Sequence, residues 1–215
     1  MRNIIFVFLI VYTVQLCISA TVEDAETELK RLRKLTTDKL QATSLEYNKI
    51  TEEVDSTAKA ASEYGYHEIH HKSNNLKAKL NHDHSISHKC RGSRKHLLHQ
   101  LEESNIADLQ RCIDHQRAEI INVLATQKLA LNEQVWNAIY EEEKHIILCG
   151  LSRGCLDAAI KHVKDKIAEV VKVIDANVNT SRQQKEAQVH LIKSCVRRIV
   201  GSAENAFDNV PSCSY

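Results

Sequence analysis

The scarcity of helix-breaking residues constrains the fold of this chain more than any other feature of its sequence. Beyond the first twenty residues there are five glycines and a single proline, Pro211. Alanine, leucine, lysine, glutamate and glutamine, which favour helices, are abundant. No stretch alternates apolar and polar residues as a half-buried strand would. The sequence therefore predicts an all-α protein built from long helices.

Residues 1–20 have the pattern of a secretory signal peptide. Arg2 supplies the positive start, an apolar run covers 4–18, and the small residues Ser19 and Ala20 lie where cleavage is expected. No later apolar run reaches the roughly 20 residues that a membrane-spanning helix needs. We therefore expect a secreted, extracellular protein whose mature chain begins near residue 21 and has no transmembrane segment.

The mature chain keeps six of the seven cysteines, because Cys17 lies in the expected signal peptide. An even number of cysteines in an oxidising compartment predicts disulfides, and the absence of a Cys-x-x-Cys pair disfavours a metal-thiolate site. The pairing stays open: a bond between Cys149 and Cys155 is possible, but we expect each of them to tie the turn to another helix. The six predicted disulfide cysteines are Cys90, Cys112, Cys149, Cys155, Cys195 and Cys213.

Apolar spacing divides the mature chain into three regions. Residues 21–64 predict an amphipathic helical arm with an imperfect coiled-coil seam, 65–89 a histidine-rich connector, and 90–213 a helical domain with all six cysteines. In the third region we expect a helix start at Ser104-Asn105, a turn at 150–154 and a helix end near 177–181. The predicted fold is a disulfide-stapled antiparallel helical bundle with an N-terminal amphipathic helical extension.

The cysteine spacing of residues 90–213 resembles the TsetseEP-type cysteine-containing domain of secreted fly proteins. The resemblance rests on Cys90, on a helical phrase around Cys112 (residues 109–120), on the short turn from Cys149 to Cys155, and on Cys195 and Cys213. The namesake has a glutamate-proline repeat tail that this chain lacks. The resemblance implies a secreted helical disulfide domain and supplies no catalytic residues.

The charge balance argues against a nucleic-acid partner. Without Arg2 the mature chain has 28 basic and 28 acidic residues, whereas nucleic-acid binding needs an excess of lysine and arginine. The sequon at Asn179-Thr180-Ser181 predicts glycosylation of Asn179 on an exposed turn.

Eight of the twelve histidines lie between residues 67 and 99, which makes this stretch a candidate metal or pH-responsive segment. His67-Glu68-Ile69-His70-His71 satisfies the zinc-protease pattern, with His67 and His71 one turn apart. Because histidine is so dense here, a chance match accounts for the motif. We interpret the segment as a solvated connector, and keep His67, His70 and His71 as the candidate metal ligands.

Trp136 and Tyr140 lie one turn apart in an apolar stretch, and we interpret the pair as part of the core rather than as the lining of a ligand pocket. No serine occupies a nucleophile-elbow setting. The sequence therefore predicts a helical protein that is not an enzyme and has no cofactor. Its predicted function is to bind a protein or a surface. The alternative function is a carrier that holds a small hydrophobic ligand between its helices.

Overall fold

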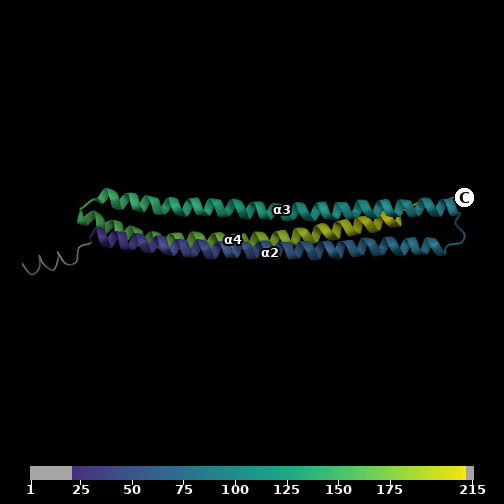
Figure 1. Cartoon of the computed structure of the whole chain (residues 1–215), viewed down its shortest axis with the longest axis horizontal. Helices are drawn as coiled ribbons and strands as arrows, with labels where there is room; N and C mark the ends of the chain where they lie inside the picture. The colour runs from purple at the N-terminus through teal and green to yellow at the C-terminus, as the bar shows by residue number, and fades with distance from the viewer. Residues whose placement is uncertain (1–20, 212–215) are drawn as a thin grey trace, which may run out of the picture. The chain divides into compact units, whose positions relative to one another are not determined.

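The computed structural model describes residues 21–211, and these form three long helices with no strand among them (Figure 1). The helices are α2 (Val22–His82), α3 (His88–Cys149) and α4 (Arg153–Asp208). The all-α prediction is confirmed. None of the described helices is both long enough and apolar enough to cross a bilayer. The predicted signal peptide and Cys213 lie outside the described residues.

Local hydrogen bonds set the ends of the helices. At the start of α2, the Asp24 carboxylate accepts from the Thr21 backbone N–H at 2.8 Å, and the Thr21 hydroxyl accepts from the Asp24 N–H at 3.2 Å. This reciprocal pair satisfies backbone donors that the first helical turn leaves free. Between α3 and α4, Gly150 adopts a positive φ of 53°, which glycine tolerates at a helix C-terminus. The turn predicted at 150–154 is therefore confirmed, although it is complete by Ser152.

The predicted connector at 65–89 is wrong over most of its length, because α2 continues without interruption to His82. Gly65 does not break α2: a Cβ at this position would lie 2.7 Å from a methyl group of Leu109, so the absent side chain lets α3 approach. Buried Ile69 and Leu80 continue the apolar face of α2 beyond Gly65. Residues 21–64 form the first part of α2, and their apolar side chains pack in the cores of the two units.

Two further helix boundaries expected from the sequence are also absent. Asn105 lies inside α3, where its side-chain amide donates to the Leu101 carbonyl at 2.7 Å instead of capping a new helix. Residues 177–181 lie inside α4, and Ser181 is fully buried there. Polar residues that are typical of caps therefore occupy helix interiors, because the packed neighbouring helices outweigh local propensity.

The chain divides into two compact units, and all three helices pass through both. The first unit comprises Met1–Glu46 and Thr126–Asn179. In its described part, α2 and α3 run in opposite directions, since Arg33 pairs with Glu143 and Ser44 with Lys128. Its aliphatic core takes residues from each helix, including Leu32, Ile139 and Val163.

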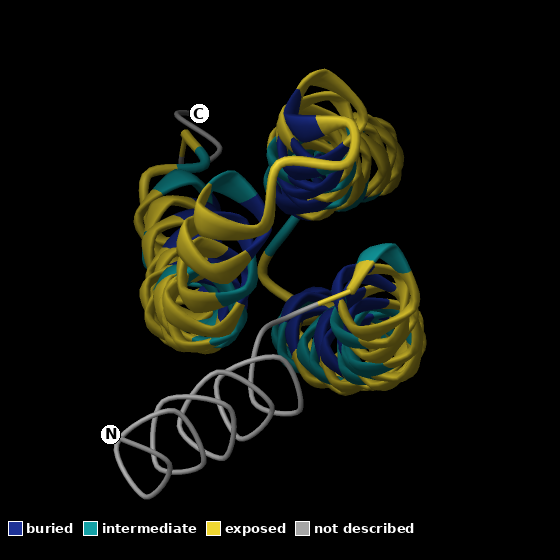
Figure 2. Cartoon of the chain, turned by 90° about the vertical axis from the view of Figure 1, so that its left-hand side faces the viewer, coloured by how far each residue is buried: buried dark blue, intermediate teal, exposed yellow. Residues whose placement is uncertain are grey.

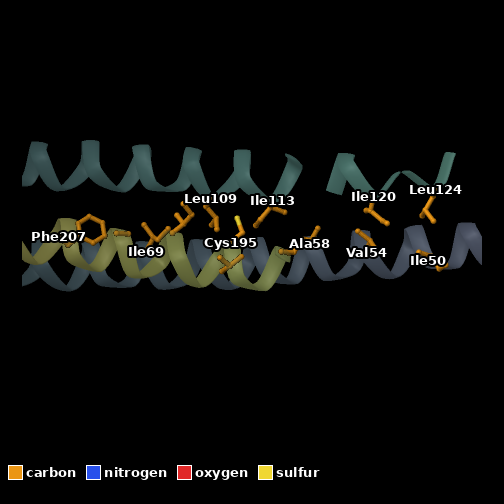
Figure 3. Close-up of a cluster of buried hydrophobic side chains, with 14 of the residues drawn as sticks. Ile50, Val54, Ala58, Ile69, Leu109, Ile113, Ile120, Leu124, Cys195 and Phe207 are labelled. Carbon is orange, nitrogen blue, oxygen red and sulfur yellow. The ribbon is translucent and has the colours of Figure 1, made fainter. Parts of the chain in front are cut away.

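The second unit comprises Tyr47–Ala125 and Thr180–Tyr215. Asp55 pairs with Arg117 and His70 with Glu102, so α2 and α3 are again antiparallel. Figure 3 shows the core of this unit, where Ile113 and Leu109 of α3 meet side chains of α2 and α4. Figure 2 shows that buried residues occupy the side of each helix that faces the other two.

Two pairs of cysteines lie at disulfide distance. Cys112 of α3 is bonded to Cys195 of α4 in the second unit, and Cys149 is bonded to Cys155 across the α3–α4 turn in the first. Cys90 is also disulfide-bonded. The expectation that Cys149 and Cys155 each tie the turn to another helix is wrong, because the two cysteines bond to each other: the short turn brings their Cα atoms to 5.3 Å, within the usual range for a disulfide.

Candidate interaction surface

Within the first unit, α3 carries apolar side chains on two faces. Val135, Ile139 and Ile146 are buried in the core. Trp136 and Tyr140 lie next to them in sequence but point outward, with exposed fractions of 44% and 61%. Their interpretation as core residues is therefore wrong. A helix rotates about 100° per residue, so an apolar pair directly beside a buried position falls on another face.

Two more apolar residues share this outward face. Leu129 and Ile147 are each 71% exposed, and with Trp136 and Tyr140 they form what we call the α3 stripe. The intervals of seven, four and seven residues add to five helical turns, so the four side chains stay aligned over about 27 Å. Leu148 and Leu151, which are also exposed, extend the apolar surface toward the α3–α4 turn.

Acidic residues flank the α3 stripe. Helical geometry places Glu133 and Glu143 within about 40° of its axis, one on each side. Glu143 forms an ion pair with Arg33 of α2, and Glu141 lies 3.8 Å from Lys144 further around α3. Glu133 and Glu143 are therefore the charged side chains of α3 nearest the row and form its acidic border, although Glu143 is paired with Arg33 and Lys144 lies about 60° from the axis on the Glu133 side.

An exposed row of this kind is suited to contact with another molecule. Contiguous apolar surface on a folded protein marks interaction sites, and tryptophan and tyrosine are enriched among the residues that dominate binding energy. The α3 stripe carries no acidic, basic, histidine or cysteine side chain in its row. It can bind through apolar burial and aromatic packing.

The predicted metal ligands His67, His70 and His71 do not converge. His67 and His71 stack on the exposed side of α2, with ring centroids 6.0 Å apart. His70 instead faces α3, where its Nδ1 lies 2.5 Å from Oε1 of the buried Glu102. Zinc binding by these residues therefore stays a prediction, and the structure divides them between two environments.

Glu102 shows what holds His70 in place. Its carboxylate accepts hydrogen bonds from Lys77 at 2.5 Å and from the Ser73 hydroxyl at 2.7 Å, in addition to the His70 contact. Burial of the carboxyl raises its pKa, but these three hydrogen bonds together outweigh burial and lower the pKa from 4.5 to about 2. This cluster is a structural ion pair between α2 and α3.

The sequon at Asn179 lies on a helix rather than on the expected turn. Asn179 is exposed within α4, so its amide is accessible to solvent. Glycosylation of Asn179 stays a prediction.

An open groove in the second unit lies between α2 and α4. Its volume is about 540 Å³, and its lining includes Ala60, Tyr64 and Val196 together with the cations Lys193 and Arg197. A lining that combines apolar side chains with two cations suits an amphipathic anion.

Comparisons with known proteins give no match. The chain matches no protein-family model, no curated protein and no solved structure. The resemblance to the TsetseEP-type domain therefore rests on cysteine spacing alone, and the candidate surface rests on the structure of this chain.

Proposed function

We propose that this protein is a secreted, non-enzymatic helical protein that binds an amphipathic helix of a partner protein through the α3 stripe. The observation that carries the proposal is the alignment of Leu129, Trp136, Tyr140 and Ile147 on an exposed face. Burying four large apolar side chains contributes about 1.5–3 kcal/mol for each that becomes fully buried, before the entropy of association is subtracted.

The acidic border of the stripe selects the class of partner. An anionic membrane surface would be repelled by Glu133 and Glu143. A helix with an apolar row flanked by lysine or arginine complements both the apolar residues and the glutamates.

The proposal can be tested with two synthetic amphipathic helices that carry the same leucine row, one flanked by lysines and the other by glutamates. Fluorescence anisotropy of each labelled helix, titrated with the full secreted chain, measures the affinity. We expect the lysine-flanked helix to bind and the glutamate-flanked helix to bind at least about tenfold more weakly, which corresponds to about 1.4 kcal/mol.

Matched variants locate the binding surface. Leu129→Ser with Ile147→Ser removes both ends of the stripe, whereas Leu45→Ser with Leu191→Ser removes two exposed leucines elsewhere. Only the first pair should abolish binding. Equal binding of both helices, self-association measured by light scattering, or adsorption to anionic vesicles would each contradict the proposed partner.

Secretion and family membership belong to the same proposal. The signal-like residues 1–20, the two cysteine pairs at disulfide distance and the TsetseEP-like spacing support an extracellular location. Disulfides persist in oxidising compartments, so the two cysteine pairs favour a location outside the cytosol.

A carrier is the second candidate function, and the α2–α4 groove favours it. Ligand pockets typically have volumes of about 300–1,000 Å³, and the groove falls in this range. Lys193 and Arg197 would face the carboxylate of a fatty acid whose chain lies along Ala60 and Val196. Native mass spectrometry of the secreted protein tests this: an adduct of a few hundred daltons, lost on denaturation and absent from Lys193→Glu, supports a carrier.

A further inference from the structure

A second buried carboxylate on α3 has a different environment from Glu102. Glu142 is 3% exposed, and its two oxygens lie 2.9 and 2.8 Å from Nδ1 of His162 on α4. His145, one turn along α3, completes a group in which one donor atom from each residue lies within 4.8 Å of the others. Within residues 21–211, no lysine or arginine forms an ion pair with Glu142, whereas Glu102 forms one with Lys77.

We propose that Glu142, His145 and His162 bind a zinc-like divalent cation. Two imidazoles and one carboxylate form a donor set that zinc prefers, and the order of affinities among divalent metals also admits copper. Calcium and magnesium prefer oxygen ligands throughout, so the two histidines disfavour them. This site is independent of the α3 stripe, because Glu142 and His145 lie on the side of α3 that faces α4.

The donors need little movement to reach bonding distance. Zinc bonded at about 2.1 Å to each of its ligands places tetrahedral donors about 3.4 Å apart. The present separations of up to 4.8 Å therefore close by a change in side-chain torsions. The two rings already meet edge to face, with centroids 5.8 Å apart and planes at 88°.

The surrounding structure holds the two helices in register at this point. The Cys149–Cys155 disulfide joins α3 and α4 one turn beyond His145 and two turns before His162. Ile146 and Val163, directly beside the two histidines in sequence, are buried in the core. Both histidines are exposed, so a cation can enter from solvent and water can complete its coordination.

Calorimetric titration of the metal-free, full secreted chain with zinc chloride tests the site. We expect one equivalent of zinc to bind, and His145→Ala to weaken that binding by roughly tenfold or more. His145 is the residue to change first, because it makes no hydrogen bond to Glu142 and its loss should leave the helices folded. Its matched control is His71→Ala, an exposed histidine of α2, which should leave the affinity unchanged.

A second readout separates ligation from folding. Cobalt(II) in place of zinc should give the visible absorption of a four-coordinate site in the wild type, and His145→Ala or Glu142→Gln should lose it while circular dichroism stays unchanged. Zinc affinity that is unaffected by His145→Ala, or that is lost in His71→Ala, would overturn the proposal and move attention to the histidines of residues 67–99.

Discussion

Glu102 is the residue whose ionisation should matter most to stability. Its folded pKa of about 2 lies below the ordinary value of 4.5, so ionised Glu102 stabilises the fold at neutral pH. The shift corresponds to at most about 3 kcal/mol. This stability is fully present above about pH 4.5 and is lost as the pH falls toward 2.

We therefore expect Glu102→Gln to lower the free energy of unfolding at pH 7 by about 2–3 kcal/mol, because Lys77 is left without its carboxylate partner. Urea unfolding of both proteins between pH 7 and pH 2 measures the difference. The gap between them should narrow below pH 4.5, and a gap independent of pH would contradict the assigned ion pair.

Two glycines inside helices should respond in opposite ways to alanine. At Gly65 the new Cβ would lie 2.7 and 2.9 Å from the methyl groups of buried Leu109, and overpacking costs about 1–3 kcal/mol. A gain of about 1 kcal/mol in helix propensity offsets part of this, so Gly65→Ala should destabilise by about 1 kcal/mol.

Gly201 provides the control, because nothing lies within 4 Å of its would-be Cβ. Gly201→Ala should stabilise the protein by about 0.5–1 kcal/mol. Thermal unfolding of the two variants shows whether each substitution raises or lowers the stability. A stabilising Gly65→Ala would show that α2 and α3 are less closely packed there.

Trp136 marks the limit of what could be predicted at this scale. The sequence identified Trp136 and Tyr140 as a pair one turn apart in an apolar stretch. The outward direction of the aromatic pair could not be predicted, because both faces of α3 between 129 and 147 are apolar and their relative burial depends on where α2 and α4 pack. His162 lies twenty residues from Glu142 in sequence, so its contact with that carboxylate required the α3–α4 register.

At the scale of the helices, the two disulfides within residues 21–211 should contribute unequally to the stability of the fold. Cys112–Cys195 closes a loop of 83 residues and Cys149–Cys155 one of 6. In the chain-entropy model the longer loop constrains the unfolded state more, by roughly 2 kcal/mol. Replacing both cysteines of the first pair by serine should therefore destabilise more than the same change in the second, as measured by denaturant unfolding under non-reducing conditions. The reverse order would indicate that the α3–α4 turn depends on its short disulfide.

The sequence correctly predicted that the chain is helical, but it did not predict how far each helix extends. The scarcity of proline and glycine predicted long helices, and the turn at Gly150 was identified from two nearby glycines. Gly65, Ser104-Asn105 and Asn177–Ser181 suggested breaks that do not occur, because Leu109 packs over Gly65 and Asn105 bonds within α3. A cap residue indicates a helix end only where no neighbouring helix buries the continuation.

For the whole molecule, the mass of the protein released by eukaryotic cells tests secretion and oxidation together. We expect a chain that begins near residue 21 and, after removal of any glycan from Asn179, is six hydrogens lighter than its reduced form. Intact-mass spectrometry before and after reduction makes the measurement. A retained N-terminus or a free thiol in the medium would contradict the predicted signal peptide or the six-cysteine pairing.

The central claim is that the α3 stripe is the binding surface, and the emission of Trp136 tests it most directly because Trp136 is the only tryptophan in the sequence. The measurement is the emission spectrum of the full secreted chain during titration with the lysine-flanked helix, together with quenching by acrylamide. Burial of a half-exposed indole should shift its emission to shorter wavelength and protect it from the quencher. Binding that leaves both the wavelength and the quenching of Trp136 unchanged would place the contact elsewhere and contradict the account.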